Sequence, residues 1–274
     1  MLLRPVVRTL HAVGVSIARV VMAAAAIALA GLLHSPAGAA GTYPWLAGTP
    51  DRASSLEARI PPPEGFQRVP LPPGSFGAWL RGLRLKPPGT PVRLFDGSLK
   101  GNQDAHVAVV DIDVGDRDLQ QCADAIMRLR AEWLLSQGRV GEISFDDGDG
   151  KPMSYAARTA DRKAFRRYLQ HVFNYAGTFS LSRQLRPKPL TALAPGDVFI
   201  QGGHPGHAVL VVDVAADTSG ARRFLLLQSY MPAQDMHILK NPASEATPWY
   251  ASEANAPLAT PEWTFPPNSL RSWP

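Results

Sequence analysis

Intramolecular disulfide bonds are excluded, because this chain of 274 residues contains a single cysteine. It also lacks a glycine-rich phosphate-binding loop and any histidine or cysteine cluster with metal-ligand spacing, so we expect neither a cofactor nor a metal. No nucleic-acid motif is present, and the formal net charge of +5 is small. Arg4, Arg8 and Arg19 lie in a predicted leader, which leaves about +2 for the remainder and gives no reason to expect a nucleic-acid partner.

Residues 1–39 have the pattern of a signal peptide. Their basic start contains no acidic residue, residues 20–33 are apolar, and Ala37-Gly38-Ala39 forms a small-residue cleavage site. The apolar run is short for a membrane span. We therefore predict a periplasmic or secreted protein with a cleaved leader. A retained inner-membrane anchor is the alternative, and the leader is the only segment expected to contact a membrane.

The 26 prolines indicate where the domain begins and ends. Many gather in residues 40–74, which we predict to be an extended N-terminal stretch, and others mark a tail over residues 261–274. Residues 75–260 have the length and composition of a single α+β domain.

Caps and apolar spacing predict four helices in that domain. Ser75 caps a short helix, and a longer one begins at Asp116 or Asp118 and ends before Gly138. Two more are expected over residues 161–173 and 179–185. The single cysteine, Cys122, falls in the first turns of the long helix and on its apolar stripe.

Strands are expected over residues 106–114, 197–201, 207–214 and 223–230, which are rich in β-branched and aliphatic side chains. The last two segments are apolar on both faces. Strands of that kind are covered on both sides, which predicts a small antiparallel sheet with helices packed against it.

The segment Pro195-Gly196-Asp197, followed by Gly206-His207 at the start of the next strand, resembles the strand–turn–strand of NlpC-type and related papain-like cysteine peptidases. The resemblance implies that fold, with Cys122 on a helix N-terminal to the sheet and His207 on the sheet. The whole chain also resembles a secreted bacterial family of unknown function, most visibly over residues 118–133, 195–214 and 228–238.

The resemblance implies a cysteine nucleophile. Cys122 would attack an amide of a cell-envelope peptide such as a peptidoglycan stem, and His207 would act as its base. This chain departs from the NlpC pattern in having Gln121 before the cysteine and Ala123 after it. With Asp118 as the cap, the Cys122 amide would also be bonded within the helix and lost as an oxyanion donor.

The third residue of the site depends on strand register. A hairpin of residues 207–214 and 223–230 places His207 opposite either Ser229 or Tyr230. Gln228 is the diagonal neighbour of His207 in the second register, and Ser229 faces it directly in the first. We favour Gln228, because its amide oxygen can accept the imidazole N–H.

The same residues also fit roles other than catalysis. Cys122 also fits a buried structural thiol, which would make the protein a non-catalytic module that binds envelope peptide or glycan. His106 is expected to lie far from Cys122, and His237 has no partner at useful spacing. The acidic run at residues 146–150 is expected to form a solvated turn rather than a calcium loop.

Overall fold

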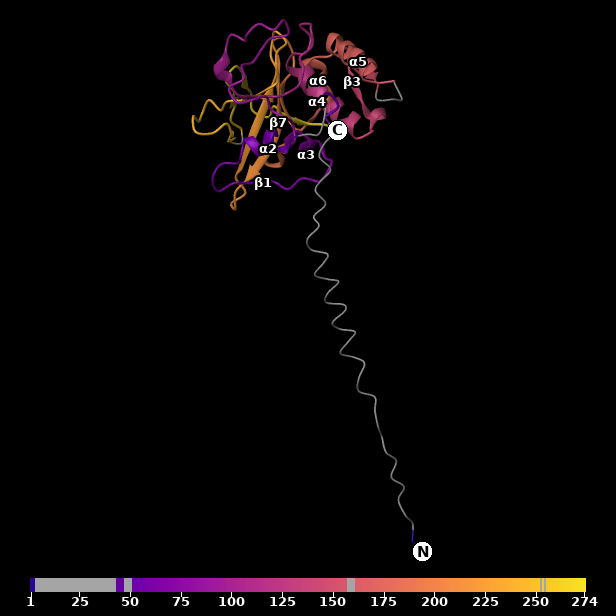
Figure 1. The fold of residues 1–274 in the computed structure, drawn as a ribbon, viewed down its shortest axis with the longest axis vertical. Coiled ribbons are helices and arrows are strands. Elements are labelled where there is room, and N and C mark those ends of the chain that lie inside the picture. The colour runs from indigo at the N-terminus through magenta and orange to yellow at the C-terminus, as the bar shows by residue number, and fades with distance from the viewer. Residues whose placement is uncertain (3–42, 47–50, 157–160, 252, 254) are drawn as a thin grey trace. The chain divides into compact units, whose positions relative to one another are not determined.

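The fold is organised by an antiparallel sheet to which both ends of the described chain contribute (Figure 1). The computed structural model describes residues 1–2, 43–46, 51–156, 161–251, 253 and 255–274. The expected signal peptide therefore lies, apart from its first two residues, outside the described residues. Residues 40–274 form one structural unit, to which the sheet and its helices belong.

The sheet has the strand order β2-β9-β8-β7-β6-β12-β5, with β1 paired to β7. Every pairing in it is antiparallel. The strands are β1 (Gln67–Arg68), β2 (His106–Val109), β5 (Arg186–Pro187), β6 (Val198–Gln201), β7 (His207–Ala216), β8 (Arg222–Gln228), β9 (His237–Leu239) and β12 (Leu270–Ser272).

The hairpin of β7 and β8 forms the centre of this sheet. Its turn is closed by Asp217, whose side chain accepts the backbone amides of Ser219 and Ala221. Leu210 pairs with Leu227, and the register shifts by one residue between Val211 and Asp213. Continued to the start of β7, this register sets His207 opposite Tyr230, which is the second of the two predicted alternatives.

Both faces of β7 and β8 are covered, as their apolar sequence predicts. Ala208, Leu210 and Val212 belong to the core on the face that α4 (Cys122–Ser136) covers. Val209 and Val211 pack on the other face, in a second core with aromatic side chains of the C-terminal part. The mixed α+β class with an antiparallel sheet is thus confirmed, but the sheet has eight strands among the described residues and is larger than the small sheet that the sequence predicts.

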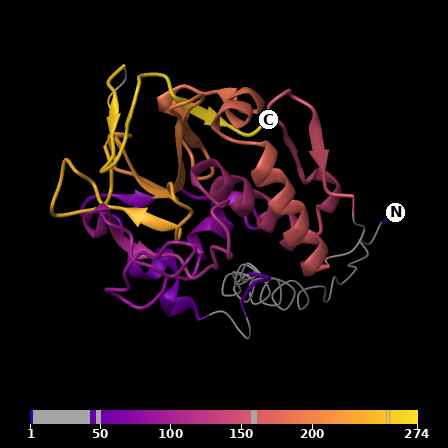
Figure 2. The ribbon, with the colours of Figure 1, turned by 90° about the horizontal axis from the view of Figure 1, so that it is seen from above.

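The helices lie beside the sheet, and α4, α5 and α6 are grouped on one side of β7 (Figures 1 and 2). α5 (Arg162–Tyr175) buries Phe165, Leu169 and Val172, the stripe expected from its sequence. α6 is Thr178–Gln184, α3 is Phe76–Arg81 with Ser75 as its cap, and α2 is Leu56–Arg59. No helix among the described residues is both long and apolar enough to cross a membrane.

The proline-rich ends take part in the sheet. β1 lies in the stretch predicted to be extended and pairs with the end of β7. In the predicted tail, β12 pairs with β6 and β5, and β11 (Thr264–Phe265) pairs with β10 (Leu258–Ala259). Strands outside residues 75–260 thus pair with strands inside that range.

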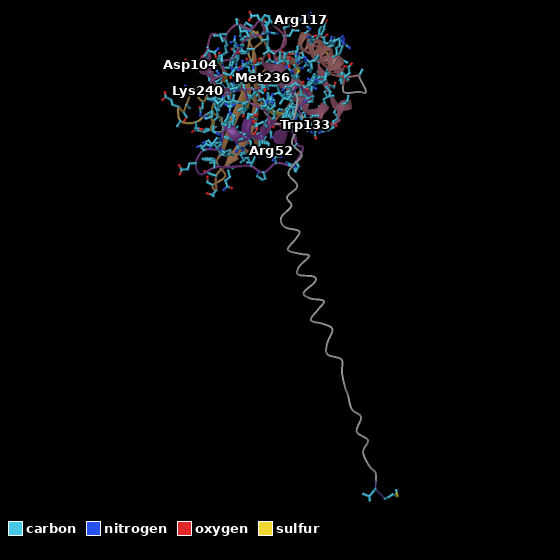
Figure 3. The ribbon with its side chains drawn as sticks, in the orientation of Figure 1. Arg52, Asp104, Arg117, Trp133, Met236 and Lys240 are labelled. Atoms are coloured by element: carbon cyan, nitrogen blue, oxygen red, sulfur yellow. The ribbon has the colours of Figure 1, made fainter. Side chains whose placement is uncertain are left out.

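The length of β2 differs from the prediction, and the turn at residues 146–150 agrees with it. β2 ends at Val109, so the strand predicted over 106–114 is about half that length. The acidic run at 146–150 joins β3 (Ser144–Asp146) to β4 (Pro152–Ser154) as a turn in which Asp147 accepts backbone amides. Side chains such as Arg117 and Lys240 reach the surface, whereas Met236 lies in the interior (Figure 3).

Candidate active site

Cys122 is the first residue of α4, and the predicted start of this helix at Asp116 or Asp118 is wrong. Gln121 is the N-cap residue, and its backbone N–H donates to Asp124 Oδ2 at 3.0 Å. Asp118 does not cap the helix, because its carboxylate accepts the amide of Ala233 at 2.6 Å. The amide of Cys122 is therefore one of the first N–H groups of the helix, which have no acceptor within it.

The thiol of Cys122 lies among backbone N–H groups. Those of Cys122, Ala123 and Ala208 interact with the sulfur and favour its thiolate form. Ala208 follows His207 on β7, so the fold brings the start of α4 to the start of the strand that carries the predicted base. Packing of α4 on the sheet thus brings together two segments that are 85 positions apart in the sequence.

Burial nevertheless dominates the acidity of this thiol. The residue as a whole is half-buried, but its surroundings desolvate the sulfur and raise the pKa of Cys122 to about 12. The nearby Asp124 acts in the same direction, since a second negative charge disfavours the thiolate. In this structure Cys122 is a protonated thiol at neutral pH.

His207 and Gln228 are joined as predicted. Nε2 of His207 lies 3.0 Å from Oε1 of Gln228, and both side chains are buried. Burial lowers the pKa of His207 to about 4, while the hydrogen bond to Gln228 and the charge of Glu262 oppose that shift. The imidazole is therefore neutral at pH 7 and can accept a proton.

Aromatic rings enclose the imidazole. The rings of Tyr230, Trp263 and Phe265 have centroids 4.7, 5.4 and 5.8 Å from that of His207. His207 is only 2% exposed as a result. Burial raises the pKa of the Tyr230 phenol, and Glu262 and then Cys122 add to that shift by their charge, so this ring borders both predicted catalytic residues.

The thiol and the imidazole both lie near the start of β7, on different faces of the sheet. α4 covers the face of Ala208, whereas His207 alternates with Val209 toward the second core. Within the described residues no hydrogen bond joins Cys122 to His207, and Nδ1 of His207 has no hydrogen-bond partner. Such bonds are often long or absent until a substrate is bound.

Two residues that sequence reasoning missed complete the surroundings of Gln228. Its Nε2 donates to Oε2 of Glu262 at 2.7 Å and lies 3.2 Å from Nε2 of His237. The expectation that His237 has no partner is therefore wrong. Its position was available from strand pairing, because Gln228 and His237 are directly opposite on β8 and β9. Glu262 comes from a distant loop, and no local pattern marks it.

The alternative third residue, Ser229, has a different role. Its hydroxyl lies 3.1 Å from the carbonyl oxygen of Gln120 and 2.9 Å from that of Gln234, so it ties the segment before Cys122 to the end of β8. His106 contacts His237 by its ring, at 5.9 Å between centroids, and lies 3.3 Å from the carbonyl of Thr90.

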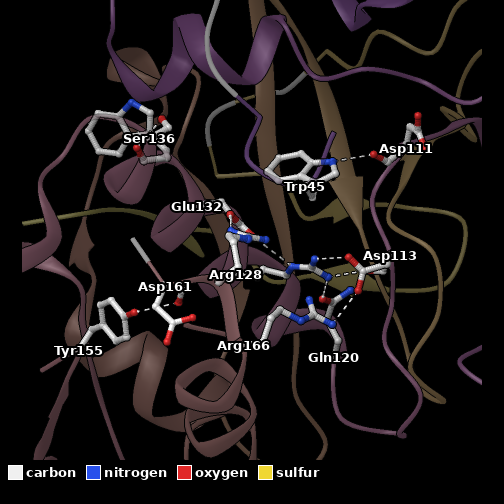
Figure 4. A network of polar contacts seen from close by, with 12 residues as sticks. Trp45, Asp111, Asp113, Gln120, Arg128, Glu132, Ser136, Tyr155, Asp161 and Arg166 are labelled. Atoms are coloured by element: carbon white, nitrogen blue, oxygen red, sulfur yellow. Dashed lines mark hydrogen bonds and ion pairs between the residues drawn. The ribbon is translucent and has the colours of Figure 1, made fainter. Parts of the chain in front are cut away.

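A charged network holds the loop that leads into Cys122 (Figure 4). Arg128, fully buried on α4, donates to the side chain of Asp113 at 2.6 Å and to Oε1 of Gln120. Asp113 also pairs with Arg166 of α5 at 2.6 Å. The position of the cysteine is thus fixed from its own helix and from the neighbouring one.

No group of three or more metal-ligating side chains occurs in the part of the chain that the structure describes. Two cavities, of about 320 and 480 Å³, lie elsewhere on this part of the molecule. The first is bordered by β2 and residues 87–91, and the second by residues 93–97 and 113–116. Neither is lined by Cys122 or His207.

Comparison with known proteins adds a family but no activity. No curated protein and no solved structure matches this chain. A family model described as "Domain of unknown function (4846)" matches residues 56–160 and 153–272, which include Cys122, His207 and Gln228. Because the match extends over most of the sequence, this chain belongs to the family of domain of unknown function 4846.

Proposed function

We propose that this protein is an exported, cysteine-dependent amide hydrolase with a papain-like site that acts on cell-envelope peptides such as peptidoglycan stems. The nucleophile is Cys122, the base is His207, and Gln228 orients the base. The substrate class and the export come from the NlpC-type resemblance and the signal-like leader.

One observation carries the proposal. The hydrogen bond of 3.0 Å between His207 and Gln228 occurs beside a helix whose first residue is the single cysteine of the chain. A nucleophile, a base and a group that orients the base are the three parts that activate a cysteine or serine. Sequence pattern and strand register point to the same three residues without any use of their distances, which strengthens the argument.

The reaction follows from these groups. The thiol proton passes from Sγ to Nδ1 of His207 as sulfur attacks the amide carbonyl, and a C–S bond forms. The N–H of Cys122 has no acceptor within the helix, because α4 begins at this residue, and it can turn from the sulfur to the oxyanion as the C–S bond forms. His207 then protonates the leaving amine as the C–N bond breaks. Water, deprotonated by the same imidazole, hydrolyses the thioester and restores the thiol.

The resting state is a neutral pair. With a pKa of about 12 for Cys122 and about 4 for His207, the proton stays on sulfur until a bound carbonyl accepts the electron pair. Catalysis therefore resembles that of a serine–histidine pair, in which proton transfer accompanies attack. The acid limit of activity is expected near pH 4, where His207 becomes protonated.

A second function, a non-catalytic module that binds envelope peptide or glycan, is favoured by a specific observation. The thiol is desolvated, His207 is enclosed by three rings, and neither cavity is lined by the two residues. In this alternative, Cys122 and His207 stabilise the core, and ligands bind at the surrounding loops.

Thiol alkylation and amine release separate the two functions. Iodoacetamide should alkylate Cys122 of the folded protein at pH 7, and His207→Ala should slow that reaction about 10²-fold. His171→Ala is the matched control, because His171 is exposed and lies on α5. Purified peptidoglycan stem peptides should yield new amines with the native protein and none with Cys122→Ala. If the thiol reacts only after unfolding and no amine appears while stem peptides still bind, the binding module is the correct function.

A further inference from the structure

The side chain of Gln228 is held by three different groups. Its Oε1 faces Nε2 of His207, and its Nε2 faces both Oε2 of Glu262 and Nε2 of His237. Gln228 is fully buried, and Glu262 is 13% exposed at its side chain. An amide carries donors on nitrogen and acceptors only on oxygen, so its neighbours decide which way it points.

Glu262 determines that orientation. Its Oε1 pairs with the ammonium group of Lys100 at 2.7 Å and accepts from Nδ2 of Asn102 at 3.4 Å. Oε2 of this carboxylate can only accept, so the NH₂ group of Gln228 must face it. The carbonyl oxygen of Gln228 then faces His207, which must donate from Nε2.

The hydrogen bonds of His237 independently require the same orientation of the Gln228 amide. Its Nδ1 lies 2.8 Å from the carbonyl oxygen of Asp235, which can only accept, so the proton of neutral His237 is on Nδ1. Nε2 of His237 therefore carries a lone pair and accepts the second N–H of Gln228. Burial keeps this imidazole neutral, because it lowers the pKa of His237 to about 3.

We infer that Glu262 and His237 are positioning residues that fix the tautomer of His207, with the proton on Nε2 and the lone pair on Nδ1. Gln228 transmits the effect, because reversing its amide would set acceptor against acceptor at both Glu262 and His237 and donor against donor at His207. Nδ1 is the ring nitrogen without a partner, and it is the one left to take the thiol proton. The role in catalysis rests on the proposed function, but the tautomer itself does not.

The substitution Glu262→Gln tests the inference with a change of one atom. Lys100 and Asn102 both donate to Oε1, so the new amide must place its oxygen toward them and its NH₂ toward Gln228. Two NH₂ groups would then meet at the contact of 2.7 Å, and Gln228 would reverse because this clash outweighs the loss of the longer contact of 3.2 Å with His237. Its NH₂ would face His207, which would accept at Nε2 and carry its proton on Nδ1. Nitrogen-15 NMR of the imidazole distinguishes the two tautomers without a substrate.

Removing the group that constrains the new amide should restore the native arrangement. In the double variant Glu262→Gln with Lys100→Met, the amide at residue 262 is free to turn its oxygen to Gln228, so the proton of His207 should return to Nε2. Glu142→Gln is the control for loss of a carboxylate, since Glu142 is exposed and pairs with Arg139. A merely structural role of Glu262 would not produce loss and recovery of one tautomer.

Alkylation by iodoacetamide supplies the second readout. Glu262→Gln should slow the reaction of Cys122 about 10²-fold at pH 7, and the double variant should recover most of the rate. His237→Phe, which leaves Glu262 in place, should have a smaller effect. The inference is overturned if native His207 carries its proton on Nδ1, or if Glu262→Gln leaves it on Nε2. If the tautomer changes as expected while His207→Ala does not slow alkylation, the inference stands and the hydrolase proposal fails.

Discussion

Two buried polar networks lie on either side of Cys122, and they are built from different chemistry. The first joins Arg128 to Asp113, Gln120 and Glu132, and it contains two buried charges, those of Arg128 and Glu132 (Figure 4). The second joins His207, Gln228 and His237 through neutral groups, with a single ion pair between Glu262 and Lys100 at its edge.

The difference separates two tasks. Charged hydrogen bonds are strong and hold a backbone segment at one position, as the Arg128 network does for the loop before α4. Neutral amides and imidazoles form weaker hydrogen bonds than charged groups. The direction of these bonds determines which ring nitrogen carries each proton. Ser229 connects the two networks by its contact with the carbonyl of Gln120. We expect the first network to determine stability and the second to determine reactivity.

The largest stability effect is expected at the charged network. Arg128→Met leaves Oε1 of Gln120 and the carbonyl oxygen of Asp113 without their donor and removes one of the two cations at the buried Glu132, so the free energy of unfolding should fall by about 3–5 kcal/mol. Urea unfolding at pH 7 measures this. Arg139→Ala breaks an exposed ion pair with Glu142 and should cost less than about 1 kcal/mol. Equal effects of the two variants would contradict the distinction between the networks.

The neutral network should make the protein sensitive to acid. Burial lowers the pKa of His237 from 6.5 to about 3 and that of His207 to about 4. Between pH 6.5 and 4 the unfolded chain binds protons that the folded protein refuses, so stability falls as pH decreases. Each histidine should account for about 3 kcal/mol between pH 7 and 4.

The variant His237→Phe isolates one of these contributions. Its free energy of unfolding should depend less steeply on pH over this interval, whereas His171→Ala, at an exposed position, should follow the native curve. Denaturant unfolding at several pH values between 7 and 4 provides the comparison. Parallel curves for the native protein and His237→Phe would show that His237 is not held neutral by the fold.

Ser229 should have a smaller effect. Ser229→Ala removes a hydroxyl that donates to the backbone at the junction of the networks and should cost about 1–2 kcal/mol. If Gln228 rather than Ser229 orients His207, the tautomer of His207 should not change in this variant. A change of tautomer in Ser229→Ala would restore the alternative in which Ser229 is the third residue.

The pairing of β7 with β8 was predictable from sequence, because both are continuous apolar segments joined by a short turn. The sequence left two registers open, and the second of these links His207 to Gln228. The start of α4 was not predictable, because Asp118 has every property of a cap and is used instead by the amide of Ala233. A distant N–H donor that competes for the carboxylate of Asp118 leaves no trace in the local sequence.

The rest of the site depends on contacts between distant segments. Glu262 lies 34 positions from Gln228 in a loop with no periodic pattern, and Lys100 comes from the opposite end of the domain. The state of the thiol was also beyond sequence reasoning. A helix start favours the thiolate, but the packing of Cys122 against β7 determines the desolvation that outweighs it.

The smallest effect concerns the thiol that lies between the networks. Burial raises the pKa of Cys122 from 9.0 to about 12, so the unfolded chain loses this proton above pH 9 while the folded protein keeps it. Stability should therefore fall as pH rises, by about 1 kcal/mol at pH 10 relative to pH 7. Cys122→Ser has no group that titrates in this range and should lack that loss in urea unfolding. If both proteins lose the same stability between pH 7 and 10, burial does not raise the pKa of Cys122; if the native protein instead gains stability relative to Cys122→Ser, the thiol is already ionised in the fold and the reaction would begin from a thiolate.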